Sequence, residues 1–208
     1  MSLEIVLATH NQHKVDEFQK ILGERMPGIT VLAYDGPEPV EDGTSFEANA
    51  FIKARAAAAH TGRIALADDS GIAVDVMGGS PGIFSARWAG PGMGAKANLD
   101  LLLAQLSDIR DPNRTGHFHC AIALVVPEAA GGPHEYAAAG LWPGRIALAE
   151  SGVHGFGYDP IFVPDGFEVS SAELAPEVKN MHSHRARAFA ALIPELERVV
   201  AASEAASG

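Results

Sequence analysis

The pattern of hydrophobic and polar positions predicts strands and helices mixed along the chain. Short apolar runs with the length of a β-strand occur at residues 4–8, 64–67, 117–126, 135–141 and 145–148. A buried strand needs only about four to eight apolar residues. We therefore expect these runs to form a β-sheet.

Apolar positions three or four residues apart predict helices between and after these strands. The first predicted helix follows the strand at 4–8 and is marked by Val15, Phe18, Ile21 and Leu22. A second is predicted over Thr44 to His60, where Thr44 and Glu47 have the spacing of a capping box. A third is expected at residues 98–106.

The last predicted helix starts at Ser183 and contains a proline. An interior proline costs about 3 kcal/mol, so Pro194 predicts either a kink or two short helices. Small residues at 201–208 predict a flexible tail. Taken together, the elements predict an α/β protein with a mixed sheet and one domain over residues 1–200.

Composition and charge narrow the possible classes of protein. The 208 residues include 15 Lys and Arg against 26 Asp and Glu, which gives a formal net charge of −11. Such an acidic chain disfavours nucleic-acid polymers and anionic membranes as partners, because both need a positive footprint. No run of about 18 apolar residues is available to cross a bilayer. Cys120 is the only cysteine, which predicts no internal disulfide and a reducing, cytoplasmic setting.

A polar loop between the first strand and the first helix is a candidate phosphate site. It contains Thr9, His10, Asn11, Gln12, His13 and Lys14. A helix N-terminus presents backbone N–H groups and the positive end of the helix dipole, and both attract phosphate. Thr9 and Asn11 would add hydrogen bonds, and Lys14 a charge. The alternative is that Asn11 only caps the helix and Lys14 is solvated.

Carboxylates at the end of a strand are candidates for metal binding or general-base chemistry. Asp68 and Asp69 follow the strand at 64–67, and Ser70 and Gly71 predict a flexible turn after them. Adjacent residues of an extended chain point to opposite faces, so we expect only one carboxylate to enter a site. The alternative is a common Asp-Ser-Gly turn without a functional role.

A second acidic segment immediately precedes the capped helix. It contains Glu41 and Gly43, and the helix itself carries Asn49 and Lys53 at i, i+4 spacing on one face. Lys53 would meet a phosphate or simply face solvent, and both interpretations stay open.

Aromatic and polar residues combine in the C-terminal half. Phe156-Gly157-Tyr158-Asp159-Pro160 brings two aromatic rings and a carboxylate onto a tight loop. Aromatic rings stack on nucleobases, and Asp159 would accept hydrogen bonds from a ring edge; core packing of Phe156 is the alternative. Ser183 is a natural N-cap for the last helix. Three further donors lie close to it in sequence: Lys179, His184 and Arg185.

Two other signatures are excluded. The run at 117–120 resembles a metal cluster, but strand alternation puts Cys120 on the face opposite His117 and His119, and no second pair of ligands has zinc spacing. Glycines 90, 92 and 94 do not form G-x-G-x-x-G, and no glycine precedes a lysine, so the dinucleotide fingerprint and the P-loop are both absent.

These segments together closely resemble the non-standard purine nucleoside triphosphate pyrophosphatases, the inosine/xanthosine triphosphate pyrophosphatase family. The resemblance runs from Ile5 to about Leu192 and rests on motifs that occur in the same order over one domain. The motifs are Thr9-x-Asn11-x-x-Lys14, Glu41-x-Gly43-x-Ser45-Phe46-x-x-Asn49-Ala50-x-x-Lys53-Ala54, Asp68-Asp69-Ser70-Gly71, Pro81-Gly82-Ile83-x-Ser85-Ala86-Arg87, Phe156-Gly157-Tyr158-Asp159-Pro160 and Ser183-His184-Arg185.

The resemblance implies a homodimer of elongated α/β subunits, each with a long mixed sheet and a cleft between two lobes. It implies Mg²⁺-dependent hydrolysis of ITP, dITP and XTP to the monophosphate and pyrophosphate, which removes deaminated purines from the nucleotide pool. By matching position, the loop from Thr9 to Lys14 and Lys53 would hold phosphates. Glu41 and Asp69 would bind the metal, and Asp69 would also accept the proton.

The same resemblance assigns the remaining substrate-binding residues. Ser70 would lie beside the substrate, and Ser183 is grouped with the substrate-binding residues. The base pocket would be formed by Phe156, Gly157, Tyr158, Asp159, Lys179, His184 and Arg185. Two other functions stay open: a pyrophosphatase for a modified pyrimidine nucleotide, and a module that senses nucleotides without cleaving them.

Overall fold

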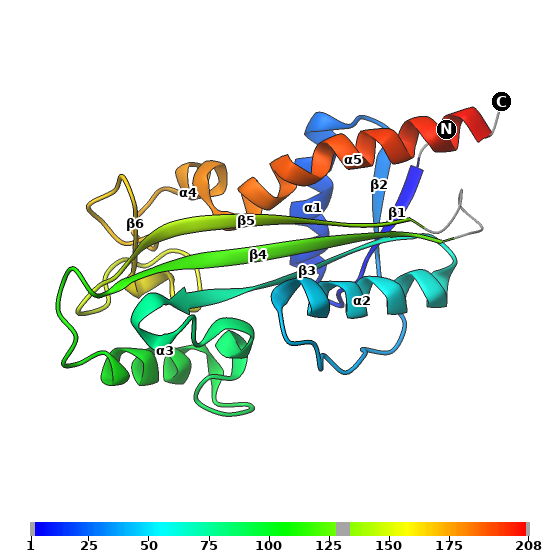
Figure 1. The fold of residues 1–208 in the computed structure, drawn as a ribbon. Helices are drawn as coiled ribbons and strands as arrows, with labels where there is room; N and C mark the ends of the chain where they lie inside the picture. The colour runs from blue at the N-terminus through cyan, green and yellow to red at the C-terminus, as the bar shows by residue number, and fades with distance from the viewer. Residues whose placement is uncertain (1–2, 128–133, 207–208) are drawn as a thin grey trace. The chain divides into compact units, whose positions relative to one another are not determined.

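A computed structural model describes residues 3–127 and 134–206 of the chain. Figure 1 shows its helices and strands. In chain order they are β1 (Leu3–Leu7), α1 (Gln12–Arg25), β2 (Ile29–Ala33), α2 (Phe46–Thr61), β3 (Ile64–Val74), the 3₁₀ turns η1 (Asp75–Met77) and η2 (Gly82–Arg87), α3 (Gly94–Gln105), β4 (Thr115–Val126), β5 (His134–Ile146), the 3₁₀ turn η4 (Asp159–Ile161), β6 (Phe162–Pro164), α4 (Pro176–His182) and α5 (His184–Ala206).

The strands form a six-stranded sheet in the order β2-β1-β3-β4-β5-β6. Strand β1 pairs in parallel with both β2 and β3, whereas β5 and β6 pair antiparallel. The predicted α/β class with a mixed sheet is therefore confirmed. The elongated subunit and the cleft between two lobes stay predictions.

The chain divides into two compact units. Unit 1 consists of Met1–Asp69, Ala121–Ala138 and Phe189–Gly208, and unit 2 of Ser70–Cys120 and Ala139–Ala188. Strands β3, β4 and β5 and helix α5 each contribute residues to both units. Each unit has a buried core of its own.

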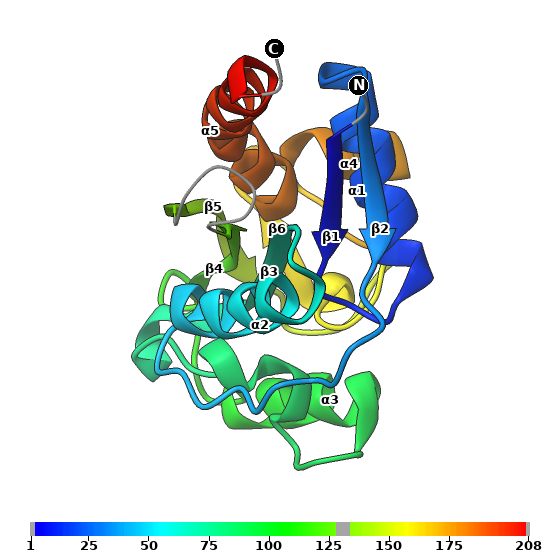
Figure 2. The same cartoon turned by 90° about the vertical axis from the view of Figure 1, so that its right-hand side faces the viewer.

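The core of unit 1 contains β1 and the apolar face of α1. Phe18 of α1 is buried, and its ring meets the ring of Phe189 edge-on at 4.4 Å between centroids. Figures 1 and 2 show α2 and the part of α5 that belongs to unit 1 on opposite faces of this unit's strands. Helix α2 buries an alanine face: Ala50, Ala54, Ala57 and Ala58.

The core of unit 2 surrounds a buried arginine. The Arg114 guanidinium donates to the carbonyl oxygens of Ile146 at 2.7 Å, Leu106 at 2.6 Å, Ala147 at 2.8 Å and Ile109 at 3.0 Å. Burial lowers the pKa of Arg114. The apolar core includes Ile72, Val74, Leu99, Leu102, Leu106, Phe118, Trp142, Ile146, Tyr158, Ile161, Phe162 and Leu174. Because a buried charge needs hydrogen-bond partners, the four carbonyls make this arginine tolerable in the interior.

The start of α2 differs from the predicted capping box. Ser45, and not Thr44, is the N-cap: its backbone is extended, and its Oγ accepts a hydrogen bond from the Ala48 N–H at 3.1 Å. The capped donor is therefore three residues after Ser45, at the position that an N-cap side chain reaches.

The predicted turn after Asp69 is wrong, because β3 runs through it without interruption. A Cβ on Gly71 would lie 2.4 Å from the Ser85 Oγ and 2.6 Å from the Gly82 carbonyl oxygen. The glycine therefore lets η2 approach the strand closely, which is a known use of glycine inside strands. What looks like turn chemistry in the sequence is close packing in the fold.

The C-terminal half contains two longer elements than expected. The two strands predicted at 135–141 and 145–148 form one strand, β5. Helix α5 continues past Pro194 to Ala206, so the proline does not split it, and residues 201–206, expected in a tail, are helical. Residues 207 and 208 lie outside the described residues. Among the residues that the structure describes, no helix is long and apolar enough to cross a membrane.

Candidate active site

Unit 1 contains a charged pocket of about 200 Å³ at the end of β1. Its lining comes from the loop after β1, the segment between β2 and α2, helix α2 and strand β3. The lining residues are Ala8, Thr9, His10, Lys14, Tyr34, Glu38, Pro39, Glu41, Lys53 and Asp68. Four of the predicted phosphate-binding residues, Thr9, His10, Lys14 and Lys53, and the predicted metal ligand Glu41 thus share one pocket.

Asp68 and Lys14 form an ion pair in this pocket. The Lys14 Nζ lies 2.8 Å from Asp68 Oδ1 and 3.1 Å from Oδ2. The Asp68 side chain is only 3% exposed and the Lys14 side chain 32%. A buried carboxylate needs a charged or hydrogen-bonding partner, and Lys14 meets that need here.

Asp69 makes separate contacts, as alternation along β3 predicts. It accepts a hydrogen bond from the Asn49 amide at 3.1 Å, and the Lys53 Nζ lies 3.6 Å from its Oδ1. Lys53 Nζ also lies 3.3 Å from Glu41 Oε1. The expectation that Asn49 and Lys53 share one face of α2 is confirmed, because both contact Asp69.

The electrostatics of Asp69 suit a proton acceptor. Burial raises the pKa of its carboxyl, while Lys53 and the Asn49 hydrogen bond lower it, and nearby Glu41 and Asp68 raise it further. The net direction is upward. A general base works best when its pKa lies near the pH at which it operates, so this shift moves Asp69 toward useful basicity.

Asn49 also joins Asp69 to the segment that carries Glu41. Its Oδ1 accepts a hydrogen bond from the Gly43 N–H at 2.9 Å. A Cβ on Gly43 would lie 2.6 Å from that oxygen, so only glycine fits this approach. Asn49 therefore fixes the end of the 34–43 segment against β3.

The donor set fits Mg²⁺. The Lys53 ammonium already lies between the Glu41 and Asp69 carboxylates, which marks a position where a positive charge is favoured. In residues 3–127 and 134–206, no group of three or more His, Cys, Asp or Glu side chains could hold a metal ion. Mg²⁺ is usually bound by one or two carboxylates together with water and substrate phosphates, so two carboxylates suffice.

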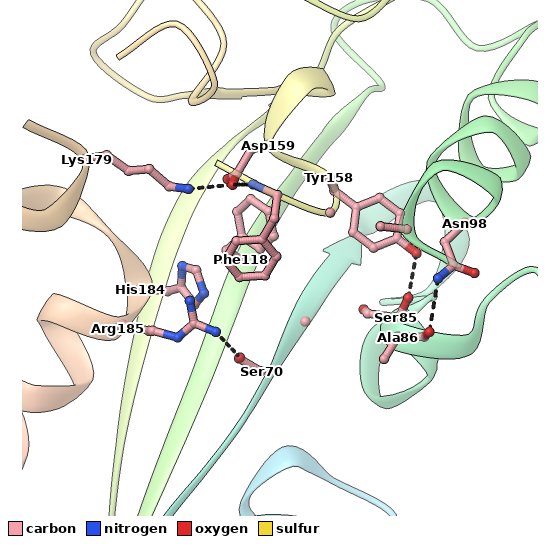
Figure 3. A pocket seen from close by; sticks show the side chains of 14 residues that line it. Ser70, Ser85, Ala86, Asn98, Phe118, Tyr158, Asp159, Lys179, His184 and Arg185 are labelled. Atoms are coloured by element: carbon pink, nitrogen blue, oxygen red, sulfur yellow. Dashed lines mark hydrogen bonds and ion pairs between the residues drawn. The ribbon is translucent and has the colours of Figure 1, made fainter. Parts of the chain in front are cut away.

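Unit 2 contains a second pocket, of about 270 Å³. Figure 3 shows Lys179, His184 and Arg185 on one side of it and Ser85, Ala86 and Asn98 on the other. Its lining is Ser70, Gly71, Ser85, Ala86, Ala95, Asn98, Phe118, Phe156, Gly157, Tyr158, Asp159, Lys179, His184 and Arg185. The predicted base-pocket residues, together with Ser70, therefore line one pocket.

Phe156 presents an open aromatic face in unit 2. Its side chain is largely exposed, at 67%. The Lys179 Nζ lies 5.7 Å and the Arg185 Cζ 5.4 Å from its ring centroid, both within the range of cation–π attraction. The alternative of core packing is therefore excluded for this ring.

Asp159 organises the loop that carries Phe156. It is buried, and its Oδ2 accepts hydrogen bonds from the Phe156 N–H at 2.7 Å and from Lys179 Nζ at 2.5 Å. Its Oδ1 accepts from the Ser171 hydroxyl at 2.8 Å. Asp159 thus connects the aromatic loop to a cationic side chain.

The opposite wall is held by hydrogen bonds to backbone groups. Tyr158 is buried, and its hydroxyl donates to the Ser85 carbonyl oxygen at 2.8 Å; burial raises the pKa of this phenol. The Asn98 amide donates to the Ala86 carbonyl at 3.0 Å and accepts from the Ala89 N–H at 2.7 Å. Ser85 Oγ accepts from the Ile72 N–H at 2.9 Å.

The wall that carries His184 and Arg185 comes from the start of α5. The His184 ring stacks on Phe118 at 4.9 Å between centroids, and Arg185 Nη2 lies 3.4 Å from the Ser70 Oγ. Ser183 is buried and caps α5 by accepting from the Ala186 N–H at 3.3 Å. Ser183 is absent from the described lining of this pocket, so its N-cap role is the one the structure bears out.

Three residues of the predicted phosphate loop are not among the described lining of the unit 1 pocket. Asn11 and Gln12 are exposed; the Asn11 N–H donates to Thr9 Oγ1 at 3.2 Å, and Gln12 bonds Asp16 at 2.9 Å. The side chain of His13 lies outside the described residues. Their roles in substrate binding stay predictions.

Sequence reasoning missed several lining residues. In unit 1 these are Tyr34 and Glu38, and in unit 2 Ala95, Asn98 and Phe118. The motif from Pro81 to Arg87 contains the lining residues Ser85 and Ala86, but the motif alone indicates no role for them. No local pattern distinguishes Asn98 or Phe118 from ordinary residues of a helix and a strand.

Comparison with known proteins gives consistent results. The Ham1 family matches residues 5–195 of the chain. A dITP/XTP pyrophosphatase of Leifsonia xyli subsp. xyli is 61% identical over 194 residues, which cover 93% of this chain and 96% of that protein. A dITP/XTP pyrophosphatase of Streptomyces avermitilis is 45% identical over 202 residues, with 94% and 98% covered.

Solved structures have the same fold. A HAM1 protein from Coxiella burnetii superposes with a TM-score of 0.85 at 40% identity, covering 94% of this chain and 99% of that one. A nucleoside-triphosphatase / dITP/XTP pyrophosphatase from Mycobacterium abscessus superposes with a TM-score of 0.78 at 46% identity, covering 92% and 100%. The chain therefore belongs to the Ham1 family.

Proposed function

We propose that this protein hydrolyses non-standard purine nucleoside triphosphates, ITP, dITP and XTP, to the nucleoside monophosphate and pyrophosphate. The observation that carries the proposal is the group formed by Asp69, Lys53 and Glu41 in unit 1, where two carboxylates converge on one cation. The names of the relatives support the same activity. The pocket of unit 2 supplies a stacking ring and donors for a base.

The reaction requires a water molecule, a proton acceptor and positive charge near the phosphates. Asp69 would accept a proton from the water while the water oxygen bonds to the α-phosphorus. The bond between the α-phosphorus and the oxygen that bridges to the β-phosphate then breaks, and pyrophosphate leaves. Lys14 and Lys53 would neutralise charge on the departing pyrophosphate. Held by Glu41 and Asp69, Mg²⁺ would supply further positive charge to the phosphate oxygens.

The preference for deaminated purines would arise in unit 2. Inosine and xanthosine carry a 6-oxo acceptor where adenine carries an amino donor. Arg185 and Lys179 are donors only, so adenine would place one donor against another. A mispaired buried polar group is costly enough to give large discrimination. Phe156 would stack on the base.

The biological task that fits this reaction is removal of deaminated purines before a polymerase uses them. The formal charge of −11 favours free nucleotides over a nucleic-acid polymer as substrate. We place the enzyme in the cytoplasm, where nucleotide pools and reduced thiols occur. We also propose a homodimer, which the family resemblance supports, and light scattering on the purified protein tests it.

Pyrophosphate release from a panel of ribo- and deoxynucleotides, with and without Mg²⁺, tests the proposal. We expect release from ITP, dITP and XTP, little from ATP and GTP, and none without Mg²⁺. Preferred cleavage of a modified pyrimidine nucleotide would support that alternative. Binding of ITP without release of pyrophosphate in Mg²⁺ would instead identify a nucleotide sensor.

A further inference from the structure

We propose that His10 is a positioning residue that holds the segment carrying Glu41 against the loop after β1. This inference rests on the proposed function, since it assigns His10 to the site of that reaction. It changes the role of His10 from a substrate ligand, which the sequence predicts, to an anchor between two walls of the pocket in unit 1.

Both ring nitrogens of His10 face the segment between β2 and α2. Nε2 lies 3.0 Å from the Gly36 carbonyl oxygen, and Nδ1 lies 3.2 Å from Glu38 Oε1. A carbonyl oxygen only accepts hydrogen bonds, so Nε2–H donates to Gly36. A carboxylate also only accepts, so the Nδ1 contact with Glu38 becomes an ion pair when the ring carries a proton on each nitrogen. Both nitrogens are directed at this segment, so neither is left for a phosphate.

The buried Tyr34 ring packs against His10 and supports its contact with the segment. Its side chain is buried, and its ring stacks on His10 with centroids 5.7 Å apart and planes 4° from parallel. His60, near the end of α2, contacts the Tyr34 ring edge-on, with 5.6 Å between the ring centroids. The Tyr34 hydroxyl donates to the Pro37 carbonyl at 3.0 Å. The segment therefore wraps around one tyrosine ring.

Gly36 shows how closely the segment follows that ring. A Cβ at this position would lie 2.4 Å from the Tyr34 hydroxyl oxygen and 2.5 Å from Cζ. Only a residue without a side chain brings the Gly36 carbonyl to His10 along this path. The contact between His10 and Gly36 is therefore specific to this backbone conformation.

The consequence for the site follows from the chain between the anchors. Asn49 holds the segment at Gly43, as described above, and His10 holds it at Gly36 and Glu38. Glu41 lies between these two anchors, and Val40 beside it is 80% exposed. Without the His10 anchor, Glu41 would sample positions away from Lys53 and Asp69. Correct placement of a metal ligand would then become less frequent.

Hydrogen–deuterium exchange on the full-length protein without ligands tests the anchor directly. His10→Phe keeps an aromatic ring for Tyr34 but removes both nitrogens. We expect the amides of the non-proline residues between 35 and 41 to exchange about fivefold faster in this variant, the factor that corresponds to one hydrogen bond. His117→Ala, a partly exposed histidine of β4, is the control and is expected to leave these amides unchanged.

His10→Gln provides the conservative rescue, because its amide retains an N–H for the Gly36 carbonyl. Slow exchange is expected to return in this variant. Equal exchange rates at residues 35–41 in the wild type and His10→Phe would overturn the proposal, as would equal rates in the Gln and Phe variants.

Kinetics separate an anchor from a phosphate ligand. For His10→Phe we expect the Mg²⁺ concentration that gives half-maximal pyrophosphate release from ITP to rise about fivefold, with kcat at saturating Mg²⁺ unchanged. A higher KM for ITP with an unchanged Mg²⁺ requirement would make His10 a direct ligand and overturn the proposal. If the wild type released no pyrophosphate, the proposed function would fail, while the exchange experiment would still decide the anchor.

Discussion

The pockets of the two units are built by different kinds of contact. In unit 1 the charged side chains pair with one another: Lys14 with Asp68, and Lys53 with Glu41 and Asp69. In unit 2 the wall at Ser85 is held by side chains that bond backbone carbonyl and N–H groups, with Tyr158 and Asn98 as the main donors. Ion pairs between side chains thus dominate the pocket of unit 1, whereas one wall of the pocket of unit 2 is fixed by bonds to the backbone.

This difference indicates a division of labour. Ion pairs between side chains can exchange their partners for phosphate oxygens or a metal ion without moving the backbone. Contacts to backbone groups fix the width of a cavity, so they suit discrimination between planar ligands of similar size. Changes in unit 1 should therefore alter the rate and the Mg²⁺ dependence, and changes in unit 2 the choice of base.

The largest effect is expected for Asp69→Asn. The amide cannot accept the proton of water, so kcat should fall about a thousandfold, within the usual range for loss of a general base. ITP should still bind, because the cationic side chains and the pocket of unit 2 remain. Pyrophosphate release and calorimetric titration with ITP measure the two properties. Near-normal turnover would remove Asp69 from the role of base.

Arg185→Ala tests the other side of the comparison. We expect kcat/KM for ITP to fall about tenfold or more, since a charge-assisted hydrogen bond is lost, with a much smaller change for ATP. The Mg²⁺ requirement should not change. Arg198→Ala, an exposed arginine further along α5, is the matched control. Equal losses on both nucleotides would show that Arg185 does not read the base.

A smaller effect is expected for Tyr158→Phe. The Ser85 carbonyl loses its donor inside a buried wall, so the free energy of unfolding should fall by about 1 kcal/mol. Urea unfolding measures this change. A shift in the Mg²⁺ requirement of this variant would contradict the separation between charge in unit 1 and shape in unit 2.

The smallest effect is expected for His119, a histidine of unit 2 that changes how the stability of the fold depends on pH. Burial, and to a lesser extent the neighbouring His117, lower the pKa of His119 below its ordinary value of 6.5. The folded state therefore binds a proton less readily than the unfolded chain, and this histidine reduces stability as pH falls through about 6.5. The difference in melting temperature between about pH 8 and pH 5.5 should shrink in His119→Gln. An unchanged difference would mean that His119 does not contribute.

Sequence patterns indicated which charged residues lie close together in unit 1 better than they indicated the elements around them. Lys14 and Asp69 were identifiable as candidates because they follow strand ends, and Lys53 because it shares a helix face with Asn49; the metal-binding role of Glu41 came only from the family resemblance. The alternation of Asp68 and Asp69 was also readable, since it follows from the geometry of an extended chain.

The walls of the pockets depended on contacts that no local pattern records. The bond between Tyr158 and Ser85 joins residues far apart in the chain. The interpretation of Ser70-Gly71 as a turn was wrong, because glycine occurs both in turns and inside strands that another backbone approaches closely. Only the packing of η2 on β3 distinguishes the two cases. The sequence does not indicate that Arg114 is buried, because its hydrogen-bond partners are backbone carbonyls, which every residue type has.

The close packing at Gly71 also determines which amino-acid substitutions this part of the fold tolerates. A mutation could remove Ser85 Oγ to make room for a side chain at position 71. The Gly82 carbonyl, 2.6 Å from the added Cβ, is a backbone group that no substitution removes. No second mutation in η2 therefore rescues a substitution of Gly71 unless the backbone itself moves. In a library of all single and paired variants, position 71 should accept glycine alone, whereas position 85 should accept other small residues.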